Sequence, residues 1–304
     1  MKSEFILPNF LIAGAAKSGS TSLYYYLKQH PDIYMSLIKE PNFFSSQCLK
    51  PPKKGPFKKR IVGFEEYCDL FIKHKGETAI GEASVEYLYY YENSIKYIKK
   101  YLGDPKIVII LRNPVERAFS NYMMLKQNNK ETLSFRNAIE QEDQRIKEAW
   151  EVAWFYKKKG FYYEPVKAYM ENFSNVYVGL FDDFRKEPFT FIKGIYAFLG
   201  VDPSFEPDVS TRFMASGIPR SRILNDFFVK KTFFQKMIRF IGVSFLKEDR
   251  WVELRDSLRA KILVRAEMDP NDKSYLQRVF HGDILNLQDL IQRDLGCWLN
   301  TEKR

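Results

Sequence analysis

Cysteine is scarce in this sequence, whose 304 residues include only Cys48, Cys68 and Cys297. Cysteines spaced so widely match neither a zinc-binding pattern nor the disulfide framework of a small secreted domain. Long apolar runs are missing too, because none approaches the roughly 20 residues that a helix needs to cross a bilayer, and the first residues lack the apolar core of a signal peptide. These absences predict a protein of a reducing compartment, and we expect it in the cytoplasm.

The sequence also lacks internal repeats and long low-complexity segments. Its hydrophobic fraction of 45% suffices for one substantial core, and we expect a single domain over residues 1–304. A formal net charge of +10 favours polyanionic partners, namely nucleotides, nucleic acids, acidic glycans or anionic lipid surfaces. Net charge alone does not distinguish among these classes of partner. The sequence motifs must do so.

Four short β-rich runs lie at residues 10–13, 78–82, 106–111 and 175–181, the second weaker than the others. Helical patterns lie at residues 20–30, 64–71, 114–127, 135–173, 189–199 and 272–299. In the fourth of these, we expect the aromatic residues between 150 and 156 to share one apolar face and to pack in the core. Strands that alternate with helices predict an α/β fold with a mostly parallel sheet, whose ligands bind beyond the carboxyl ends of the strands.

The segment AGAAKSGSTSL, residues 13–23, joins the first β-rich run to the first helix. Backbone amides of residues 18–22 can point at one phosphate-like group, the helix dipole favours negative charge there, and Lys17 adds a full positive charge. The pattern predicts a site for a phosphate or a phosphosulfate. The alternative is a structural strand-to-helix turn with a solvated lysine.

The order of residues in this loop is informative. Nucleoside triphosphatases carry G-x-x-x-x-G-K-[ST], with the lysine after the second glycine. Here Lys17 precedes Gly19, and no other stretch restores the standard order. The loop is therefore not the usual one of a kinase or an ATPase.

A second basic site follows the strongest β-rich run, KIVIIL, in the segment RNPVERAFSNYMMLKQ. Arg112 lies at the strand end, Pro114 suits the first turn of a helix, and Ser120 lies about two turns into that helix. An arginine fork and a hydroxyl in this arrangement can hold a second phosphate. Taken alone, Arg112 fits a surface ion pair equally well.

Three further segments are basic. The loop FMASGIPRSR, residues 213–222, could fold over a nucleotide, with Arg220 or Arg222 at a phosphate and Phe213 on a base, or could be a plain basic linker. The loop KPPKKGPFKKR, residues 50–60, favours a solvated surface loop over a patch for an anionic acceptor. Residues 223–246 mix aromatic and basic side chains, which favours a core-facing helix over contact with an anionic membrane.

Four motifs in this order, AGAAKSGSTSL, KEPNFF at 39–44, ILRNPVERAFSNY at 110–122 and SGIPRSR at 216–222, resemble sulfotransferases that use 3′-phosphoadenosine 5′-phosphosulfate (PAPS). The sequence is most similar to bacterial members of the branch that includes the heparan sulfate sulfotransferases. The resemblance extends from about Asn9 to Trp298. It implies the P-loop-like sulfotransferase fold and transfer of a sulfuryl group from PAPS to an acceptor hydroxyl.

The resemblance also implies roles for individual residues. The 5′-phosphosulfate is held by Lys17, Ser18, Gly19, Ser20, Thr21 and Ser22. The 3′-phosphate is held by Arg112 and Ser120, and Arg220 completes the nucleotide site. Glu40 occupies the position of the catalytic base, and Lys17 stabilises the leaving phosphate; no metal is implied. The structural alternative for Glu40 is a surface carboxylate paired with Lys39.

Two departures from the family pattern bear on the acceptor and the compartment. Residues 205–225 lack the cysteine pair that heparan-type enzymes carry near the adenine, which agrees with a cytoplasmic enzyme. Ala83 stands where those enzymes have a lysine that helps to engage the acceptor. We therefore expect a carbohydrate or another small metabolite rather than a heparan-like acceptor. Glu82, Ser84 and the aromatic run 87–91 could line its cleft, although such aromatics also suit a core.

Histidine is as scarce as cysteine, and the cytosolic branch of sulfotransferases uses a histidine as its base. The three candidates, His30, His74 and His281, lie outside any recognisable motif, and we predict structural roles for all of them. Two hypotheses from other classes stay open: a kinase with a variant phosphate loop, and a non-enzymatic basic protein that binds nucleic acid or an anionic membrane. The missing G-K-[ST] order and the lack of a clear metal carboxylate argue against the kinase, and the non-enzymatic hypothesis leaves the four ordered motifs unexplained.

Overall fold

The structure is a computed structural model that describes residues 5–47, 51–54, 60–210, 218–219, 263–264 and 266–299, with only the backbone described at 218–219 and 263–264. Arg220, Arg222 and Phe213 of the basic loop, and the segment 223–246, lie outside these ranges. The predictions made for them stay predictions.

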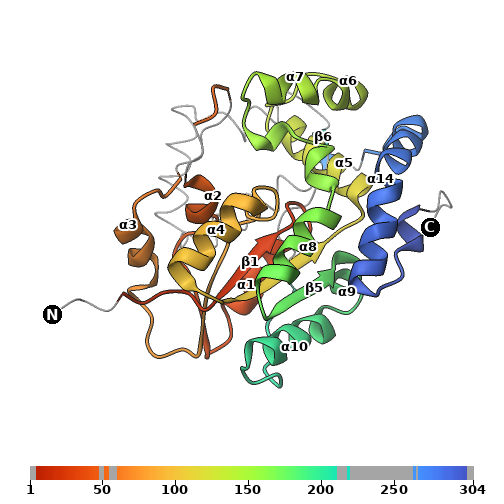
Figure 1. Cartoon of the computed structure of the whole chain (residues 1–304). Helices are drawn as coiled ribbons and strands as arrows, with labels where there is room; N and C mark the ends of the chain where they lie inside the picture. The colour runs from red at the N-terminus through yellow and green to blue at the C-terminus, as the bar shows by residue number, and fades with distance from the viewer. Residues whose placement is uncertain are drawn as a thin grey trace, which may run out of the picture.

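The centre of the molecule is a five-stranded sheet of order β2-β3-β1-β4-β5, in which every neighbouring pair is parallel (Figure 1). Its strands are β1 (Phe10–Gly14), β2 (Ile33–Met35), β3 (Ala79–Ala83), β4 (Lys106–Leu111) and β5 (Val176–Leu180). Four of them coincide with the β-rich runs, which confirms the predicted fold class. The sequence missed β2, because its three residues are too few to form a pattern and pairing with β3 defines it. A separate antiparallel pair joins β6 (Ile218–Pro219) and β7 (Leu263–Val264).

The helices surround this sheet. They are α1 (Ser20–Leu27), α2 (Phe43–Ser46), α3 (Phe64–Cys68), α4 (Tyr91–Leu102), α5 (Pro114–Gln127), α6 (Phe135–Glu140), α7 (Glu142–Lys147), α8 (Tyr163–Asn172), α9 (Phe181–Lys186), α10 (Pro188–Leu199), α14 (Pro270–Ile291) and α15 (Gly296–Leu299). Short 3-10 turns lie at Asp69–Phe71, Val152–Trp154 and Lys158–Gly160. The sequence did not predict α4, whereas α1, α5 and α10 begin and end close to their predicted bounds.

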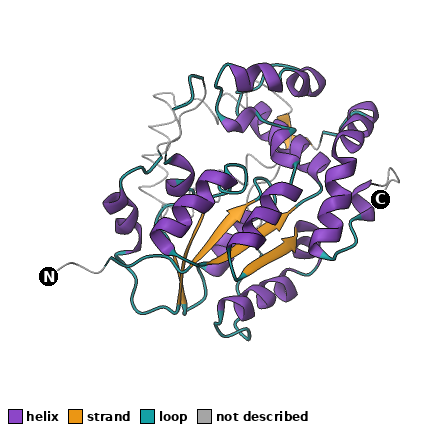
Figure 2. Ribbon diagram, in the orientation of Figure 1, coloured by secondary structure: helices purple, strands orange, loops and turns teal. Residues whose placement is uncertain are grey.

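Both faces of the sheet are buried, since side chains alternate along each strand. On β4, Ile107, Ile109 and Leu111 pack in one cluster with α4, α5, α8 and α14. Val108 and Ile110 turn to the opposite face, which α1 and α10 cover. Figure 2 shows the strands between these helices. The result is a three-layer α/β/α arrangement with its loops free to form a site at the sheet edge.

The aromatic residues near position 150 do not lie on a helix, which corrects the expectation of one helical face. Residues 148–162 are mostly irregular, and Trp154, Phe155 and Tyr156 are nevertheless buried. The buried Glu142 carboxylate explains the break in the helix, because it accepts hydrogen bonds from the amides of residues 156, 157 and 158. These amides are thereby satisfied outside a helix. The core assignment was right and the helical one was wrong.

The predicted helix over residues 272–299 is divided in two. Gln292 adopts a left-handed conformation with a φ of 51° and ends α14. The Leu295 amide then donates to the side chain of Gln288 at 3.0 Å, which turns the chain into α15. No helix in the described ranges is long and apolar enough to cross a membrane.

Candidate functional site

Three residues singled out in separate motifs meet at one edge of the sheet. Because β1, β3 and β4 are parallel, their carboxyl ends share this edge. Lys17 follows β1, Arg112 follows β4 directly and donates from Nη1 to the Lys17 carbonyl at 3.3 Å, and the Glu40 amide donates to the carbonyl of Ala83, the last residue of β3, at 2.9 Å. The structure thus brings the donor and base motifs together where α/β sheets bind ligands.

The loop after β1 is shaped by its backbone. Lys17 and Gly19 both adopt left-handed conformations, with φ of 68° and 88°, and Gly19 is the N-cap of α1. A Cβ on Gly19 would approach ring atoms of Phe181 and Phe184 at 3.1 Å, and therefore this turn needs glycine for its φ and for its space. Residues 20, 21 and 22 form the first turn of α1, where unpaired amides make an anion site.

The Lys17 ammonium lies deep in this site, although part of the residue reaches the surface. Burial is the main cause that lowers the pKa of Lys17 to about 8, and the positive charge of Arg112 lowers it further. Glu40 acts in the opposite direction, which places its carboxylate within electrostatic reach of the lysine. A lysine held in this way gains much from an arriving anion, because the anion offsets both the burial and the repulsion.

Arg112 is braced by several elements. Its side chain donates to Glu116 at 3.0 Å and stacks over the Phe181 ring at 4.9 Å, so that the surface ion pair considered as the alternative is present. Its carbonyl accepts from the Tyr162 hydroxyl at 3.0 Å, and the Tyr162 amide donates to Asp283 of α14 at 2.7 Å. Arg112 is therefore fixed beside the Lys17 loop and keeps part of its guanidinium on the site.

Asn113, which the sequence did not single out, caps the helix after Arg112. Its side chain accepts from the amides of residues 115 and 116 and donates to the Trp298 carbonyl at 3.4 Å. The Trp298 indole in turn donates to Asp182 of α9 at 3.2 Å. Residues far apart in the sequence thus hold the strand end that carries Arg112.

Helix α5 presents one predicted and one unpredicted polar residue. Ser120 is almost fully buried on this helix, one turn beyond Glu116. Arg117 is fully buried, donates from Nη2 to the Tyr156 carbonyl, and has no hydrogen-bond partner for Nε or Nη1 among the described residues. Burial lowers its pKa, and its charge also contributes to the lowered pKa of Lys17. The helical spacing of Arg117 with Pro114 and Asn121 on the buried face was the available signal.

The KEPNFF segment carries Glu40 on a loop between β2 and α2. Glu40 Oε1 lies 2.7 Å from Lys39 Nζ, so that the ion pair of the structural alternative is present. Both side chains are only about one-fifth exposed, at 17% and 20%. The pair faces the donor side, since both residues act on the pKa of Lys17. The ion pair and a catalytic position are therefore compatible.

The predicted cleft lining at residues 82–87 is instead a buried network. Glu82, Ser84 and Tyr87 are hidden from solvent, with exposures of 0% each, and Glu82 accepts hydrogen bonds from both hydroxyls. Tyr89 and Tyr91 are half-buried and lie on the same stretch. The expectation that Glu82 and Ser84 line an acceptor cleft is thus wrong, because the apolar packing of α3, α4 and α8 closes over them.

Two histidines have the partners of structural residues. His30 is buried, accepts from the Asp32 amide at 3.0 Å and pairs through Nε2 with the Asp202 carbonyl at 2.9 Å. His74 Nε2 lies 3.0 Å from the Glu77 carbonyl. Neither contacts the Lys17 loop. Within the described ranges, no three His, Cys, Asp or Glu side chains gather as metal ligands.

Two described residues of the basic loop 50–60 form ion pairs. Lys54 Nζ lies 2.9 Å from Glu148 and 5.2 Å from the centre of the Trp150 ring. At the other end, Arg60 forms a mostly buried ion pair with Glu86 at 3.0 Å. The expectation of a solvated loop therefore fits Lys54, which stays exposed, and is wrong for Arg60.

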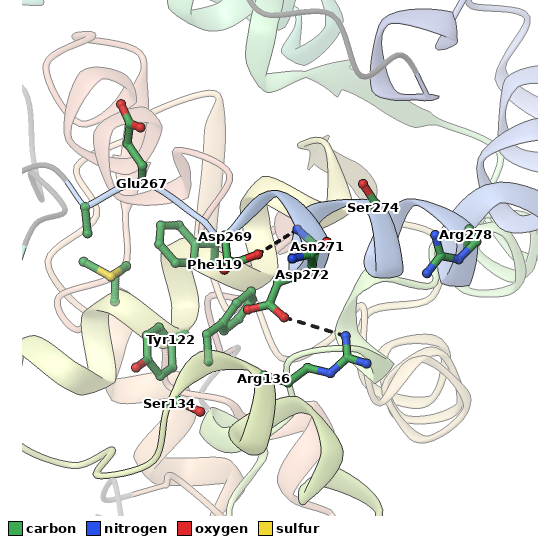
Figure 3. A pocket seen from close by; sticks show the side chains of 13 residues that line it. Phe119, Tyr122, Ser134, Arg136, Glu267, Asp269, Asn271, Asp272, Ser274 and Arg278 are labelled. Carbon is green, nitrogen blue, oxygen red and sulfur yellow. Dashed lines mark hydrogen bonds and ion pairs between the residues drawn. The ribbon is translucent and has the colours of Figure 1, made fainter.

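A cleft of about 710 Å³ lies apart from these residues (Figure 3). It is bounded by α5, α6 and the start of α14, and Arg136 reaches across it to within 3.7 Å of Asp272. None of the residues assigned to the donor or to the base lines it. This cleft therefore lies outside the proposed donor and base site.

Comparisons with known proteins identify the family and the fold. A model of the sulfotransferase family matches residues 8–207. A solved sulfotransferase from Alicyclobacillus acidocaldarius is 34% identical, with a TM-score of 0.76 over 97% of this chain and 100% of that chain. Carbohydrate sulfotransferase 15 of Mus musculus is 28% identical over 167 residues, 44% of this chain and 30% of that protein. The bifunctional heparan sulfate N-deacetylase/N-sulfotransferase 1 of Caenorhabditis briggsae is 26% identical over 73% of this chain and 26% of that protein. The chain spans less than a third of these two curated relatives.

Proposed function

This chain belongs to the sulfotransferase family and is an enzyme, and on that premise we propose that it transfers a sulfuryl group from PAPS to a hydroxyl of a carbohydrate or another small acceptor. The observation that carries the proposal is the meeting of Lys17, Arg112 and Glu40 at the carboxyl edge of the sheet. Family membership also removes the non-enzymatic hypothesis.

The donor side fits a phosphosulfate. The Ser18 hydroxyl is fully buried and has no hydrogen-bond partner among the described residues, and two nitrogens of the buried Arg117 share this state. Buried polar groups are normally paired, and leaving one unpaired costs on the order of 1–3 kcal/mol. A polyanion that accepts from the 17–22 loop supplies a partner for Ser18, and Lys17, with its lowered pKa, gains a counter-charge.

The residues have distinct tasks in the transfer. Sulfuryl transfer should resemble phosphoryl transfer through a loose transition state, and positioning and charge stabilisation then provide most of the catalysis. Glu40 takes the proton of the acceptor hydroxyl. The oxygen of that hydroxyl bonds to sulfur, and the bond from sulfur to the phosphate oxygen of the donor breaks. Lys17 neutralises the charge that grows on that oxygen, while amides of the 18–22 loop hold the sulfuryl oxygens.

The acceptor class rests on the relatives and on local charge. Two curated relatives are named for carbohydrate and heparan sulfate substrates, which supports a carbohydrate acceptor. Ala83 lacks the lysine implied for heparan-type enzymes, but Lys39 places an ammonium beside Glu40. Lys39 can orient the carboxylate of Glu40 and contact an acceptor hydroxyl. A single lysine at this place suits a small acceptor and does not form the extended binding surface that a long acidic glycan needs.

Calorimetric titration with 3′-phosphoadenosine 5′-phosphate (PAP), the desulfated product, tests the donor site. We expect tight binding to the wild type and to Glu40→Gln. Lys17→Ala and Arg112→Ala should each weaken binding roughly 10- to 100-fold, because each removes a charged hydrogen bond worth about 1.5–3 kcal/mol. A wild type that does not bind PAP would contradict the proposal.

A transfer assay tests the acceptor. Sulfur-labelled PAPS is offered with simple pyranosides, neutral oligosaccharides, heparosan and small phenols. We expect label on the sugars, little on heparosan and none on the phenols. Preference for phenols would overturn the carbohydrate assignment, and magnesium-dependent consumption of ATP without sulfate transfer would favour the variant kinase.

A further inference from the structure

The loop that carries Glu40 has an unusual backbone. Glu40 and Asn42, on either side of Pro41, have φ of 60° and 54°. The left-handed region costs a glutamate such as Glu40 roughly 1–2 kcal/mol, whereas asparagine adopts it more readily. Such conformations persist only where surrounding contacts fix them, and they cluster at functional sites. Contacts from elsewhere in the chain must therefore hold this loop.

Those contacts come from the last residue of β3 and from the segment that follows it, residues 83–87. The Glu40 amide donates to the Ala83 carbonyl, as described above. The Asn42 amide donates to the Ser84 hydroxyl oxygen at 3.0 Å, and the Phe44 amide donates to the Tyr87 hydroxyl oxygen at 3.4 Å. Every second amide of the loop is thus held, and two of the three acceptors are hydroxyl groups.

Glu82 sets the direction of both hydroxyls. Its Oε2 accepts from Ser84 at 2.7 Å and its Oε1 accepts from Tyr87 at 2.5 Å. A hydroxyl has one proton, and a hydroxyl that gives it to a carboxylate keeps its lone pairs for other donors. Because Glu82 takes both protons, Ser84 and Tyr87 must act as acceptors toward the loop amides.

The surroundings make this role costly to remove. Burial raises the pKa of Glu82 to about 7, while the two hydroxyl bonds favour its ionised form. The buried Tyr67 of α3 lies beside the carboxyl group, the Tyr169 hydroxyl of α8 donates to the Tyr87 carbonyl at 3.1 Å, and Lys39 is the nearby positive charge. A buried carboxyl group in such a hydrogen-bond network fixes the orientation of its neighbours in addition to filling space in the core.

We propose that Glu82 is a positioning residue, which acts through Ser84 and Tyr87 to hold Glu40 in its left-handed conformation beside Lys17. This inference rests on the proposed function, since it takes Glu40 as the base. Glu82 itself does not touch the reacting atoms. Its removal should therefore misplace the base and leave the donor site intact.

The test compares Ser84→Ala, Glu82→Gln and Tyr87→Phe with a matched control, Tyr122→Phe. Tyr122 is also a buried tyrosine, and its hydroxyl donates to the Leu133 carbonyl at 3.0 Å, away from the Glu40 loop. Hydrogen exchange of the peptide 37–47 reports the loop without any acceptor. The kcat with the best sugar of the panel and the affinity for PAP report the chemistry and the donor site.

Amide exchange in 37–47 should rise about tenfold or more in Ser84→Ala and Glu82→Gln, and less in Tyr87→Phe, whose bond to the loop is longer. We expect kcat to fall on the order of 10- to 100-fold, as for a base displaced by about 1 Å, with PAP affinity within about twofold of wild type. Tyr122→Phe should change neither exchange nor kcat.

The failures are distinguishable. If Ser84→Ala and Tyr87→Phe fold and keep wild-type exchange and kcat while Glu40→Gln is inactive, the inference is wrong and the proposed function stands. An equal loss of kcat in Tyr122→Phe would also overturn it, because the effect would be general. If Glu40→Gln itself keeps wild-type kcat, the proposed role of the base fails first. Should Glu82→Gln not fold, Ser84→Ala and Tyr87→Phe decide alone.

Discussion

The donor loop and the Glu40 loop present their charged groups in different ways. The donor loop, residues 15–22, is shaped by its own backbone, with two left-handed residues and a helix N-terminus in one stretch of chain. The Glu40 loop is held by hydroxyl and carbonyl groups of residues 83–87, and the two hydroxyl contacts join residues 42 and 43 positions apart in the sequence. Backbone amides of one loop can bind an anion, whereas a catalytic carboxylate must be oriented toward the acceptor. That orientation needs contacts from other parts of the chain.

The two regions also differ in how they balance charge. On the donor side, Lys17, Arg112 and Arg117 are all positive, and their mutual repulsion contributes to the lowered pKa of Lys17. On the other side, Lys39 and Glu40 neutralise one another at 2.7 Å. The donor side thus carries excess positive charge that favours an anion, whereas the charges of Lys39 and Glu40 on the other side cancel.

The largest effect should come from Glu40→Gln. Loss of a general base costs on the order of 10²- to 10⁴-fold in rate. We expect kcat to fall by that amount, while calorimetry shows unchanged PAP affinity. Glu65→Gln, on the exposed side of α3, is the control and should keep full activity. Parallel losses of kcat and PAP affinity would show that the two regions are not separate.

Gly19→Ala should damage the donor loop alone. Its φ of 88° and the ring atoms at 3.1 Å leave no room for a side chain. We expect the free energy of unfolding in urea to fall by about 1–2 kcal/mol, and PAP affinity with it.

Gly282→Ala is the matched control for this change. Nothing lies within 4 Å of its built Cβ in α14. Alanine there should stabilise the protein by about 0.5–1 kcal/mol, because glycine is a poor helix former. Equal effects at positions 19 and 282 would mean that the loop conformation is not special.

The lowered pKa of Lys17 predicts a pH dependence of donor binding. With a pKa of about 8, free Lys17 loses its proton above pH 8, whereas a bound anion raises the pKa and keeps the proton in place. Binding therefore takes up protons above pH 8, and the dissociation constant for PAP should rise about tenfold between pH 7.5 and 9.

Calorimetry in buffers of different ionisation enthalpy measures this proton uptake. Lys17→Arg keeps its charge at every pH of the assay and should remove both the uptake and the pH dependence. Unchanged proton uptake in Lys17→Arg would assign it to another group.

The smallest effect belongs to the exposed part of the basic loop. Lys54 and Glu148 are 58% and 37% exposed, and such ion pairs contribute little. Lys54→Ala should lower the free energy of unfolding by at most about 1 kcal/mol, including its contact with Trp150, and should leave PAP affinity unchanged. A larger loss in urea unfolding would give this loop a role in holding the acceptor side.

Local patterns made the fold and the donor loop predictable from the sequence. The run KIVIIL is followed within a few residues by the Pro114 helix start, and the run 10–13 is followed by a small-residue turn and the helix from Ser20. Family membership, the enzyme class and the parallel sheet are confirmed. The roles of individual site residues, the single domain and the cytoplasmic location stay predictions.

Residues that act through tertiary contacts were harder to find. Glu82 lies in a strand whose other members are apolar, and only the fold shows that its carboxyl group receives two hydroxyls. The sequence did not single out Arg117, which is fully buried on α5. The Glu142 carboxylate stabilises the turn at residues 156–158 by accepting hydrogen bonds that a helix would otherwise provide. No local sequence pattern indicates such a contact. Long-range polar contacts were the common cause.

The bracing of Arg112 by α14 and Trp298 gives the site an order of assembly on the ribosome. The donor loop and its helix are made early, but Asp283 and Trp298, which fix Tyr162 and Asn113, emerge much later. Contacts between distant parts of a chain close slowly, and a growing chain folds from its amino end. We therefore expect a nascent chain to carry the phosphate loop well before it can hold the arginine opposite, and to become competent for the nucleotide only after Asp283 and Trp298 have been made.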